Sequence, residues 1–255
     1  MNLNKENYTI DEFLGGLFKL KQPKKGFRAG TDSILLAASI HLKKEHSLIE
    51  LGCGVGAVLL SLNHRFPNNT LSGIEFDNVS YSYALENLRK LRETIEILNA
   101  DITEISKKST YKSFQQRFDQ AVMNPPFFQN SHKKQQSVSR ENARSFSNQS
   151  HELALWFKAA NFLLRDQGLL TIVYSTASLS SVITIAETAH FGGFKLFPIW
   201  SKPGNNSKRI IIQMQKNSKK PTVLKPGLIL YNADNTHTPE AISILNNGNQ
   251  LNIND

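Results

Sequence analysis

The sequence predicts an α/β fold: a mostly parallel sheet of seven strands, with helices on both faces and an antiparallel hairpin near the C-terminus. From residue 47, short apolar runs alternate with amphipathic segments, which is the pattern of consecutive βαβ units. Two later apolar runs flank the turn-rich residues 201–207, and this arrangement indicates an antiparallel pair that closes the sheet. We therefore expect one main doubly wound domain.

Each element of that domain follows from its local pattern. The expected strands are residues 47–51, 70–74, 94–98, 118–123, 169–174, 194–200 and 208–215. Apolar residues recur at helical spacing between several of them, and the expected helices are residues 57–66, 79–91 and 151–164. In the last helix, Leu153, Trp156, Ala160 and Leu163 form one stripe, which we interpret as facing the core.

Smaller additions are expected at both ends of the chain. The N-terminal part is predicted to form a hairpin, interrupted by Gly15-Gly16, and then a lid-like helix that opens at Thr31-Asp32. Near the C-terminus, Thr238 followed by a proline is typical of a helix start. The expected segments are residues 1–45, the main domain 46–220 and an extension 221–255 that packs on it.

Composition excludes several classes of protein. The 255-residue chain is 40% hydrophobic, which is too rich in core-forming residues for a disordered chain. Its longest apolar stretches fall far below the roughly 20 residues that a membrane-spanning helix needs. Glu6, Asp11 and Glu12 stand where a signal peptide would begin with basic residues. We expect a cytoplasmic monomer, with no membrane association and no obligate protein partner.

Metal and disulfide chemistry are not expected. Cys53 is the single cysteine, so an intrachain disulfide and a multi-cysteine zinc site are excluded, and the seven histidines show no metal-binding spacing. Cys53 has no neighbouring base in the sequence, and we interpret it as a small packing residue. We predict no metal site.

The charge balance points to a polyanionic partner. Lys and Arg number 30 against 21 Asp and Glu, which gives a formal charge of +9 and an isoelectric point near 9.6. Such a surplus favours phosphate contacts and counterion release, so nucleic acid is the leading partner. The alternative is that the charge serves solubility only.

The first motif with chemical meaning is the Gly-rich segment 50–56, Glu-Leu-Gly-Cys-Gly-Val-Gly, which follows a strand and opens a helix. Glycines let the backbone approach a ligand there, and the helix start offers free N–H donors. Taken alone, the pattern also fits a dinucleotide-binding turn, with Glu75 at about the distance of roughly 20 residues expected for the ribose-binding acid. We expect the segment to bind a cofactor.

Acids and an amide recur at the ends of successive predicted strands. Glu50 ends the first strand, Glu75 follows the second, Asp101 the third and Asn124 the fourth. In a doubly wound sheet, the carboxyl ends of the strands face the ligand crevice, so these four side chains are predicted to converge on one site. Each acid taken singly has an alternative interpretation as a loop or capping residue.

The segment Asn124-Pro125-Pro126-Phe127 favours one type of chemistry. Two prolines make a stiff turn whose carbonyls point outward beside the Asn side chain, and an exocyclic amine needs acceptors of this kind. The aromatic ring that follows offers a flat face on which a flipped base can stack, an interaction worth roughly 1 to 3 kcal/mol. A plain loop is the alternative interpretation.

Together these motifs resemble those of the class I S-adenosylmethionine-dependent methyltransferases, with their Rossmann-like fold, that modify planar amines, chiefly the N6 of adenine. A closer resemblance covers nearly the whole chain and is to the bacterial tRNA(Val) adenine-37 N6-methyltransferases. It rests on the motifs above together with residues 13–16, 22–23, 28–32, 198–200, 208–209 and 226–228.

The resemblance implies a role for each cofactor-binding residue. Glu50 would hold the methionine ammonium group of S-adenosylmethionine, Glu75 would accept both ribose hydroxyls, and Asp101 would accept the adenine amine. The backbone at Gly52, Gly54 and Gly56 would lie against the cofactor. The N-terminal residues Arg28, Gly30 and Thr31 would close over its methionine end, together with Asp32, for which a structural role at the helix start is an equal alternative.

The resemblance also implies how the reaction is catalysed. The methyl group is already activated, so the task is to position the amine in line with it. Asn124 Oδ1 and the Pro125 carbonyl would accept hydrogen bonds from the target amine, with Pro126 stiffening the turn. Phe127 would stack on the base, although many relatives carry Tyr there and its hydroxyl is missing here.

The polar segment 129–150 follows this turn, shows almost no apolar period and is predicted to be a loop, either functional or disordered. Its cations suit contact with an RNA backbone. They are Lys133, Lys134, Arg140 and Arg144.

The same motifs also allow other functions. Ribosomal RNA, DNA adenine or a protein glutamine amide are alternative substrates for the same turn. A nicotinamide-dependent oxidoreductase fits the Gly-rich segment but leaves residues 124–127 unexplained. An RNA-binding module without turnover is a further alternative, although none of the motifs is broken.

Overall fold

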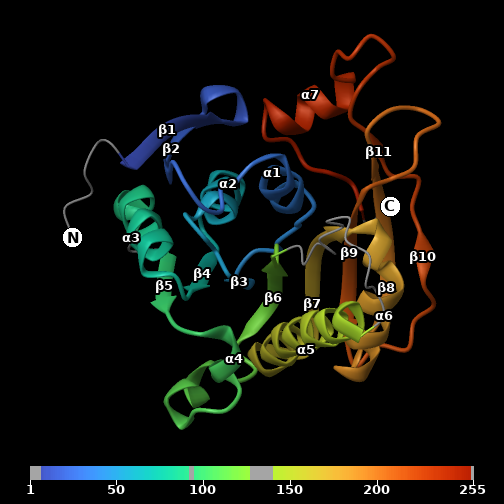
Figure 1. The fold of residues 1–255 in the computed structure, drawn as a ribbon. Coiled ribbons are helices and arrows are strands. Elements are labelled where there is room, and N and C mark those ends of the chain that lie inside the picture. The colour runs from blue at the N-terminus through green and yellow to red at the C-terminus, as the bar shows by residue number, and fades with distance from the viewer. Residues whose placement is uncertain (1–6, 92–94, 127–139, 254–255) are drawn as a thin grey trace.

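The computed structural model describes residues 7–91, 95–126 and 140–253, and the side chains of residues 140–149 are outside that description. A sheet of nine strands runs through the molecule in the order β10-β8-β9-β7-β6-β3-β4-β5, with β11 also paired to β8 (Figure 1). The strands are β3 (Ser47–Leu51), β4 (Thr70–Glu75), β5 (Ile95–Asn99), β6 (Phe118–Met123), β7 (Leu164–Ser175), β8 (Phe191–Trp200), β9 (Arg209–Lys216), β10 (Val223–Leu224) and β11 (Leu228–Ile229).

The predicted fold class is confirmed. Strands β5, β4, β3, β6 and β7 are parallel, and β9 is antiparallel to both β7 and β8. These are the seven strands expected from the sequence. The two-residue strands β10 and β11 were not predicted, because a pair of residues carries no periodic signal.

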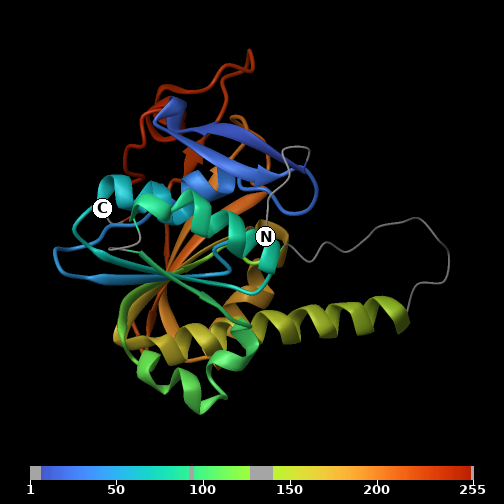
Figure 2. The same cartoon turned by 90° about the vertical axis from the view of Figure 1, so that its left-hand side faces the viewer.

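Helices cover both faces of the sheet (Figure 2). They are α1 (Thr31–Ala38), α2 (Ala57–Arg65), α3 (Asn78–Asn87), α4 (Ile102–Ile105), α5 (Arg140–Leu163), α6 (Leu179–Thr188) and α7 (Pro239–Leu245). Helices α1, α2 and α3 lie on one face, while α4, α5 and α6 lie on the other. The parallel strands are therefore buried on both sides, which explains their nearly continuous apolar sequences.

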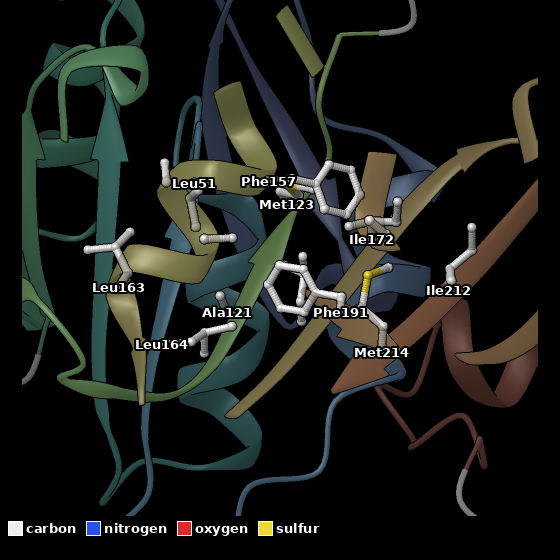
Figure 3. Packing of buried hydrophobic residues seen from close by; sticks show 14 of the residues in the cluster. Leu51, Ala121, Met123, Phe157, Leu163, Leu164, Ile172, Phe191, Ile212 and Met214 are labelled. Carbon is white, nitrogen blue, oxygen red and sulfur yellow. The ribbon is translucent and has the colours of Figure 1, made fainter. Parts of the chain in front are cut away.

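The core on the α5 face shows how the sheet and helices are joined (Figure 3). Phe157 of α5 is fully buried and meets Phe191 of β8 edge to face, with ring centroids 6.0 Å apart. Met123 and Ile172 from neighbouring parallel strands, both fully buried, belong to the same cluster. This packing fixes α5 against the strands that carry the Gly-rich turn and the Asn-Pro-Pro turn.

The N-terminal hairpin is confirmed as strands β1 (Tyr8–Phe13) and β2 (Phe18–Pro23), which pair in register from Tyr8↔Pro23 to Phe13↔Phe18. Helix α1 begins at Thr31 as predicted. At the other end, α7 begins where expected, and the hydroxyl of Thr238 accepts a hydrogen bond from the Ala241 amide at 3.1 Å. The C-terminal segment packs back on α1, because the Leu251 amide donates to the Ala38 carbonyl at 2.8 Å.

The predicted loop 129–150 is wrong over its second half. Helix α5 begins at Arg140, well before the expected start at residue 151. Residues 140–150 contain no Gly or Pro, so the backbone can satisfy its hydrogen bonds as a helix although the side chains show little apolar period. This N-terminal part of α5 projects beyond the sheet (Figure 2).

Candidate active site

The Gly-rich turn connects β3 to α2 and depends on a left-handed backbone. Gly52, Gly54 and Gly56 have φ values of 67°, 54° and 87°, a region that disfavours side chains. At Gly52 a Cβ atom would lie 2.5 Å from the Trp156 ring of α5. Residue 52 therefore has to lack a side chain for α5 to pack beside the turn.

Glu75 ties this turn to the end of β4. Its Oε2 accepts a hydrogen bond from the Gly54 amide at 2.7 Å, and its Oε1 accepts one from the Asp77 amide at 2.7 Å. Burial raises the pKa of Glu75, although these backbone hydrogen bonds work in the opposite direction. Each oxygen keeps a second acceptor site for a ligand hydroxyl.

Glu50 is the most unusual carboxylate of the described residues. It is 2% exposed, and its Oε2 is buried without any hydrogen-bond partner. Burial raises the pKa of Glu50 well above its usual value, and the nearby charge of Glu75 raises it further. A buried acceptor without a partner is costly in a folded protein, so a donor is expected to complete it.

Asn124, directly after β6, also buries an acceptor that has no hydrogen-bond partner. This acceptor is its Oδ1, and of the two prolines that follow, Pro125 is buried and Pro126 is exposed. Asn124 lines two neighbouring cavities, one of about 510 Å³ and one of about 200 Å³. It is thus an unused acceptor where the two cavities adjoin. Phe127, the predicted stacking residue, lies outside the described residues.

The larger cavity brings together four of the predicted site residues, Gly52, Gly54, Glu75 and Asn124. The predicted Glu50, Gly56 and Asp101 do not line it. Its other walls are apolar and were not predicted as site residues. They include Phe27, Phe76, Val79, Ile102 and Trp156. The sequence offered one signal for these walls, because the aromatic residue Phe76 directly follows the strand-end acid Glu75. In the structure, Phe76 is 68% exposed and lines the cavity.

Trp156 has two roles. The sequence pattern placed it on the core-facing stripe of α5, and it does pack partly against the core. It also lines the larger cavity above Gly52. Helical periodicity could not separate these roles, since one large ring reaches both surroundings.

The N-terminal residues line the smaller cavity. Arg28, Gly30, Thr31 and Asp32 surround it together with Asn124. Arg28 is ion-paired with Asp11 of β1 and donates to the Pro23 carbonyl at 2.7 Å, so the hairpin fixes its position. Asp32 accepts a hydrogen bond from Arg209 Nε at 3.1 Å, which joins α1 to β9.

Asp101 and Cys53 occupy structural positions. Asp101 caps α4 by accepting a hydrogen bond from the Thr103 amide at 2.8 Å, and its neighbour Ile102 lines the cavity instead. Cys53 is buried, and burial raises the pKa of its thiol well above the usual value, which suits a packing residue.

The predicted RNA-binding residues are only partly placed. Lys133 and Lys134 lie outside the described residues, and Arg140 and Arg144 lie on α5 with undescribed side chains. The described part of the chain holds no cluster of three or more His, Cys, Asp or Glu side chains that could bind a metal ion. Within the same residues, no helix combines the length and apolar character that crossing a membrane requires.

The strand order, the Gly-rich turn and the strand-end acceptors define a Rossmann-like class I methyltransferase. The family model for the methyltransferase small domain matches residues 25–190, and the chain belongs to that family.

Curated relatives share a more specific name. The chain is 28% identical to a tRNA1(Val) (adenine(37)-N6)-methyltransferase of Actinobacillus pleuropneumoniae serotype 7, over 92% of this chain and 95% of that protein. It is 29% identical to the protein of the same name from Bacteroides thetaiotaomicron, over 79% and 82% of the two chains.

Solved structures show the same fold. A predicted O-methyltransferase from Agrobacterium tumefaciens superposes with a TM-score of 0.70 at 20% identity, covering 87% of this chain and 98% of the other. TYW2 from Pyrococcus horikoshii, solved in complex with MeSAdo, gives a TM-score of 0.55 at 11% identity and covers 85% and 74% of the two chains.

Proposed function

We propose that this methyltransferase transfers the methyl group of S-adenosylmethionine to the N6 amine of an adenine in tRNA, with adenine 37 of a valine tRNA as the specific target. The observation that carries the proposal is the buried, unpartnered Oδ1 of Asn124 where the two cavities adjoin. The names of the curated relatives support the substrate.

The residues that line the larger cavity, together with Glu50 and Asp101, which do not line it, fit the cofactor. The unpartnered Oε2 of Glu50 would accept a hydrogen bond from the methionine ammonium group, and the free lone pairs of Glu75 would accept the ribose hydroxyls. The apolar walls at Phe76, Val79 and Ile102 suit an adenine ring. Asp101 already caps α4, so its proposed contact with the adenine amine would use its second oxygen.

The N-terminal segment completes the cofactor site in this proposal. Gly30 and Thr31 lie at the start of α1 beside Asn124, and they would meet the methionine end of the cofactor. The hairpin fixes Arg28 next to them through its ion pair with Asp11. Residues 1–45 would thus close over a methyltransferase domain formed by residues 46–220, with residues 221–255 packed on it.

Catalysis would consist of positioning. When bound, S-adenosylmethionine supplies an electrophilic methyl group that needs no further activation. Asn124 Oδ1 and the Pro125 carbonyl would accept two hydrogen bonds from the target amine and hold its lone pair in line for attack. Pro126 would keep the turn rigid, and Phe127 would stack on the base. The amine proton released after transfer would pass to solvent.

The substrate side of the proposal is tRNA. The formal charge of +9 favours a nucleic-acid partner, and the cations at positions 133, 134, 140 and 144 follow the Asn-Pro-Pro turn in the chain. The protein would act as a cytoplasmic monomer without a metal ion or a further protein subunit.

One experiment tests the reaction and the substrate class together. The purified protein is incubated with methyl-labelled S-adenosylmethionine and tRNA from cells that lack its gene, and the nucleosides are analysed by mass spectrometry. Labelled N6-methyladenosine is expected. A protein that binds the cofactor yet labels no tRNA would contradict the proposal, and label in ribosomal RNA or in protein glutamine would identify the alternative substrate.

A further inference from the structure

A second cavity lies on the outer side of α5, away from the predicted site residues. It has a volume of about 630 Å³ and lies between α5, α6 and the short helical segment Ser109–Phe114 with the residues that follow it. We call it the α5 groove. Its α5 side carries His151, Leu155 and Lys158, and its α6 side carries Thr184, Ile185 and Thr188.

The groove carries one exposed cation, Lys158, and two imidazoles on a lining that is otherwise largely apolar. Lys158, His151 and His190 line it, and all three are exposed. No ion pair involves any of these three among the described residues, and the described lining contains no Asp or Glu. The side-chain amides of Gln115 and Gln116 supply further hydrogen-bond donors, whereas the Thr188 hydroxyl already donates to the Thr184 carbonyl at 2.9 Å. This combination suits phosphate oxygens and sugar hydroxyls.

The floor of the groove is rigid. Lys216 of β9 is 6% exposed, and its ammonium group donates to the carbonyls of Asn161 and Leu164 at 2.6 and 2.8 Å. The Asn161 side chain in turn donates to the Ala189 carbonyl at 2.9 Å, which ties the end of α5 to the end of α6. The groove is thus held by contacts between three elements, and it does not depend on a ligand to form.

The groove is also close to the active site, because two helices border both. Trp156 of α5 lines the larger active-site cavity, and Lys158 of the same helical turn lines the groove. Ile102 at the start of α4 lines that cavity, and Ser106 just after its end lines the groove. The groove and the active-site cavity therefore lie on different sides of α5 and α4.

The helical period extends this charge toward the projecting end of α5. Positions 140, 144, 151 and 158 are separated by four, seven and seven residues, so they fall on one stripe of the helix. The sequence places Arg, Arg, His and Lys at these positions. Arg140 and Arg144 share this stripe by sequence position alone, since their side chains lie outside the described residues. Two Arg and one Lys at spaced positions along a 24-residue helix match an extended polyanion better than a single small anion.

We infer that the α5 groove and this stripe bind the phosphodiester backbone of the tRNA beside the nucleotide that is methylated. Lys158 and His151 contact backbone phosphates on the strand that leads away from the target base. This inference rests on the proposed function for its partner, and it adds a second contact surface distinct from the catalytic turn. Because the contacts are to the backbone, they set affinity and not the choice of base.

The test compares charge reversal in the groove with charge reversal elsewhere. Lys158→Glu is paired with Lys44→Glu, an exposed lysine before β3 that lines neither the active-site cavities nor the groove. Methylation of tRNA is measured at varied tRNA concentrations, and tRNA binding is measured by fluorescence anisotropy between 50 and 200 mM salt, on the order used to resolve counterion release. Binding of S-adenosylhomocysteine serves as the folding control.

Lys158→Glu is expected to raise the KM for tRNA about tenfold or more, with kcat within about twofold and unchanged S-adenosylhomocysteine binding. The milder Lys158→Gln is expected to lower the salt slope of tRNA binding by about one unit. If both variants bind and methylate tRNA as Lys44→Glu does, the groove is not an RNA contact. If the wild type methylates no tRNA, the proposed function fails, while the anisotropy series still decides whether the groove binds RNA.

Discussion

Asp119 at the amino end of the β3–β6 strand pair and Glu50 at its carboxyl end are buried carboxylates with opposite surroundings. At the amino end, Asp119 is 8% exposed and accepts hydrogen bonds from the Ser47 amide and hydroxyl at 2.8 and 3.0 Å, and it is ion-paired with Arg165. At the carboxyl end, Glu50 and Asn124 each bury an oxygen with neither a hydrogen bond nor an ion pair. The amino end also buries atoms without a hydrogen bond, at Gln120 Oε1 and His46 Nδ1, and Asp119 Oδ1 has its ion pair with Arg165 in place of a hydrogen bond.

The pKa directions show the same contrast. Burial alone would raise the pKa of Asp119, yet the hydrogen bonds from Ser47 and the charges of Arg165 and His46 outweigh it, and the pKa is lowered. Burial and the charge of Glu75 raise the pKa of Glu50. Asp119 therefore stabilises the fold, whereas we propose that the ligands supply the partners of Glu50 and Asn124. The carboxyl end is where parallel α/β sheets bind their ligands.

The largest effect is expected from removing the unpartnered amide at the carboxyl end. Asn124→Ala should lower kcat by about 100-fold or more, because the target amine loses an acceptor that aims it at the methyl group. Cofactor affinity should stay within a few-fold. The matched control is Asn249→Ala in the C-terminal segment, since Asn249 is exposed, its side chain donates only to the Ser243 hydroxyl, and it lines neither active-site cavity. Equal rates for the two variants would remove Asn124 from the mechanism.

The next largest effect is expected from Gly52→Ala. The added Cβ would lie 2.5 Å from the Trp156 ring at a φ of 67°, so both a clash and a left-handed backbone oppose it. We expect a loss of about 2 to 4 kcal/mol of folding free energy, together with weaker cofactor binding. Gly204→Ala has a φ of 76° and nothing within 4 Å, so it should cost only about 1 kcal/mol. Urea denaturation of both variants measures the difference, and similar losses would show that the ring contact is unimportant.

Asp119→Asn tests the amino end. Replacing the carboxylate weakens charge-assisted hydrogen bonds from Ser47, and we expect a loss of about 1.5 to 3 kcal/mol of stability at pH 7. Since the pKa of Asp119 is lowered in the folded state, its contribution is present above the unfolded value near 3.9 and is lost as the pH falls. The variant should therefore approach the wild type in acid. The kinetic constants at 25 °C should not change, and a fall in kcat would contradict the separation of the two ends.

Glu50→Gln should have the smallest effect on the stability of the cofactor-free protein, and it should raise that stability where the preceding variants lower it. The raised pKa of Glu50 means that its contribution to stability is full below the unfolded value near 4.3 and is lost as the pH rises through the folded value. The cofactor-free variant should thus melt at a higher temperature than the wild type at pH 7.5, with the gap closing near pH 4. The stabilisation given by S-adenosylmethionine should shrink in the same variant. A lower melting temperature without cofactor would contradict the account.

The sequence predicted the positions of those site residues that stand at the ends of recognisable strands. Strands β3 and β6 have the expected bounds, so Glu50 and Asn124 were placed correctly at neighbouring strand ends. It could not predict that Arg28 is fixed by Asp11 or that Asp32 meets Arg209, because these contacts join distant segments. It also missed Trp156 as a cavity residue, because apolar periodicity reports burial and not ligand contact. It missed the first turns of α5 because residues 140–150 show little apolar period.

The most direct test of the central claim is a crystal structure with S-adenosylhomocysteine bound. We expect the ligand in the active-site cavity of about 510 Å³, with its amino group within about 2.7 to 3.2 Å of Glu50 Oε2 and its sulfur facing Asn124. A ligand bound in another place, with the Glu50 and Asn124 oxygens still lacking partners, would contradict the claim that these atoms are the ligand-binding acceptors of the site.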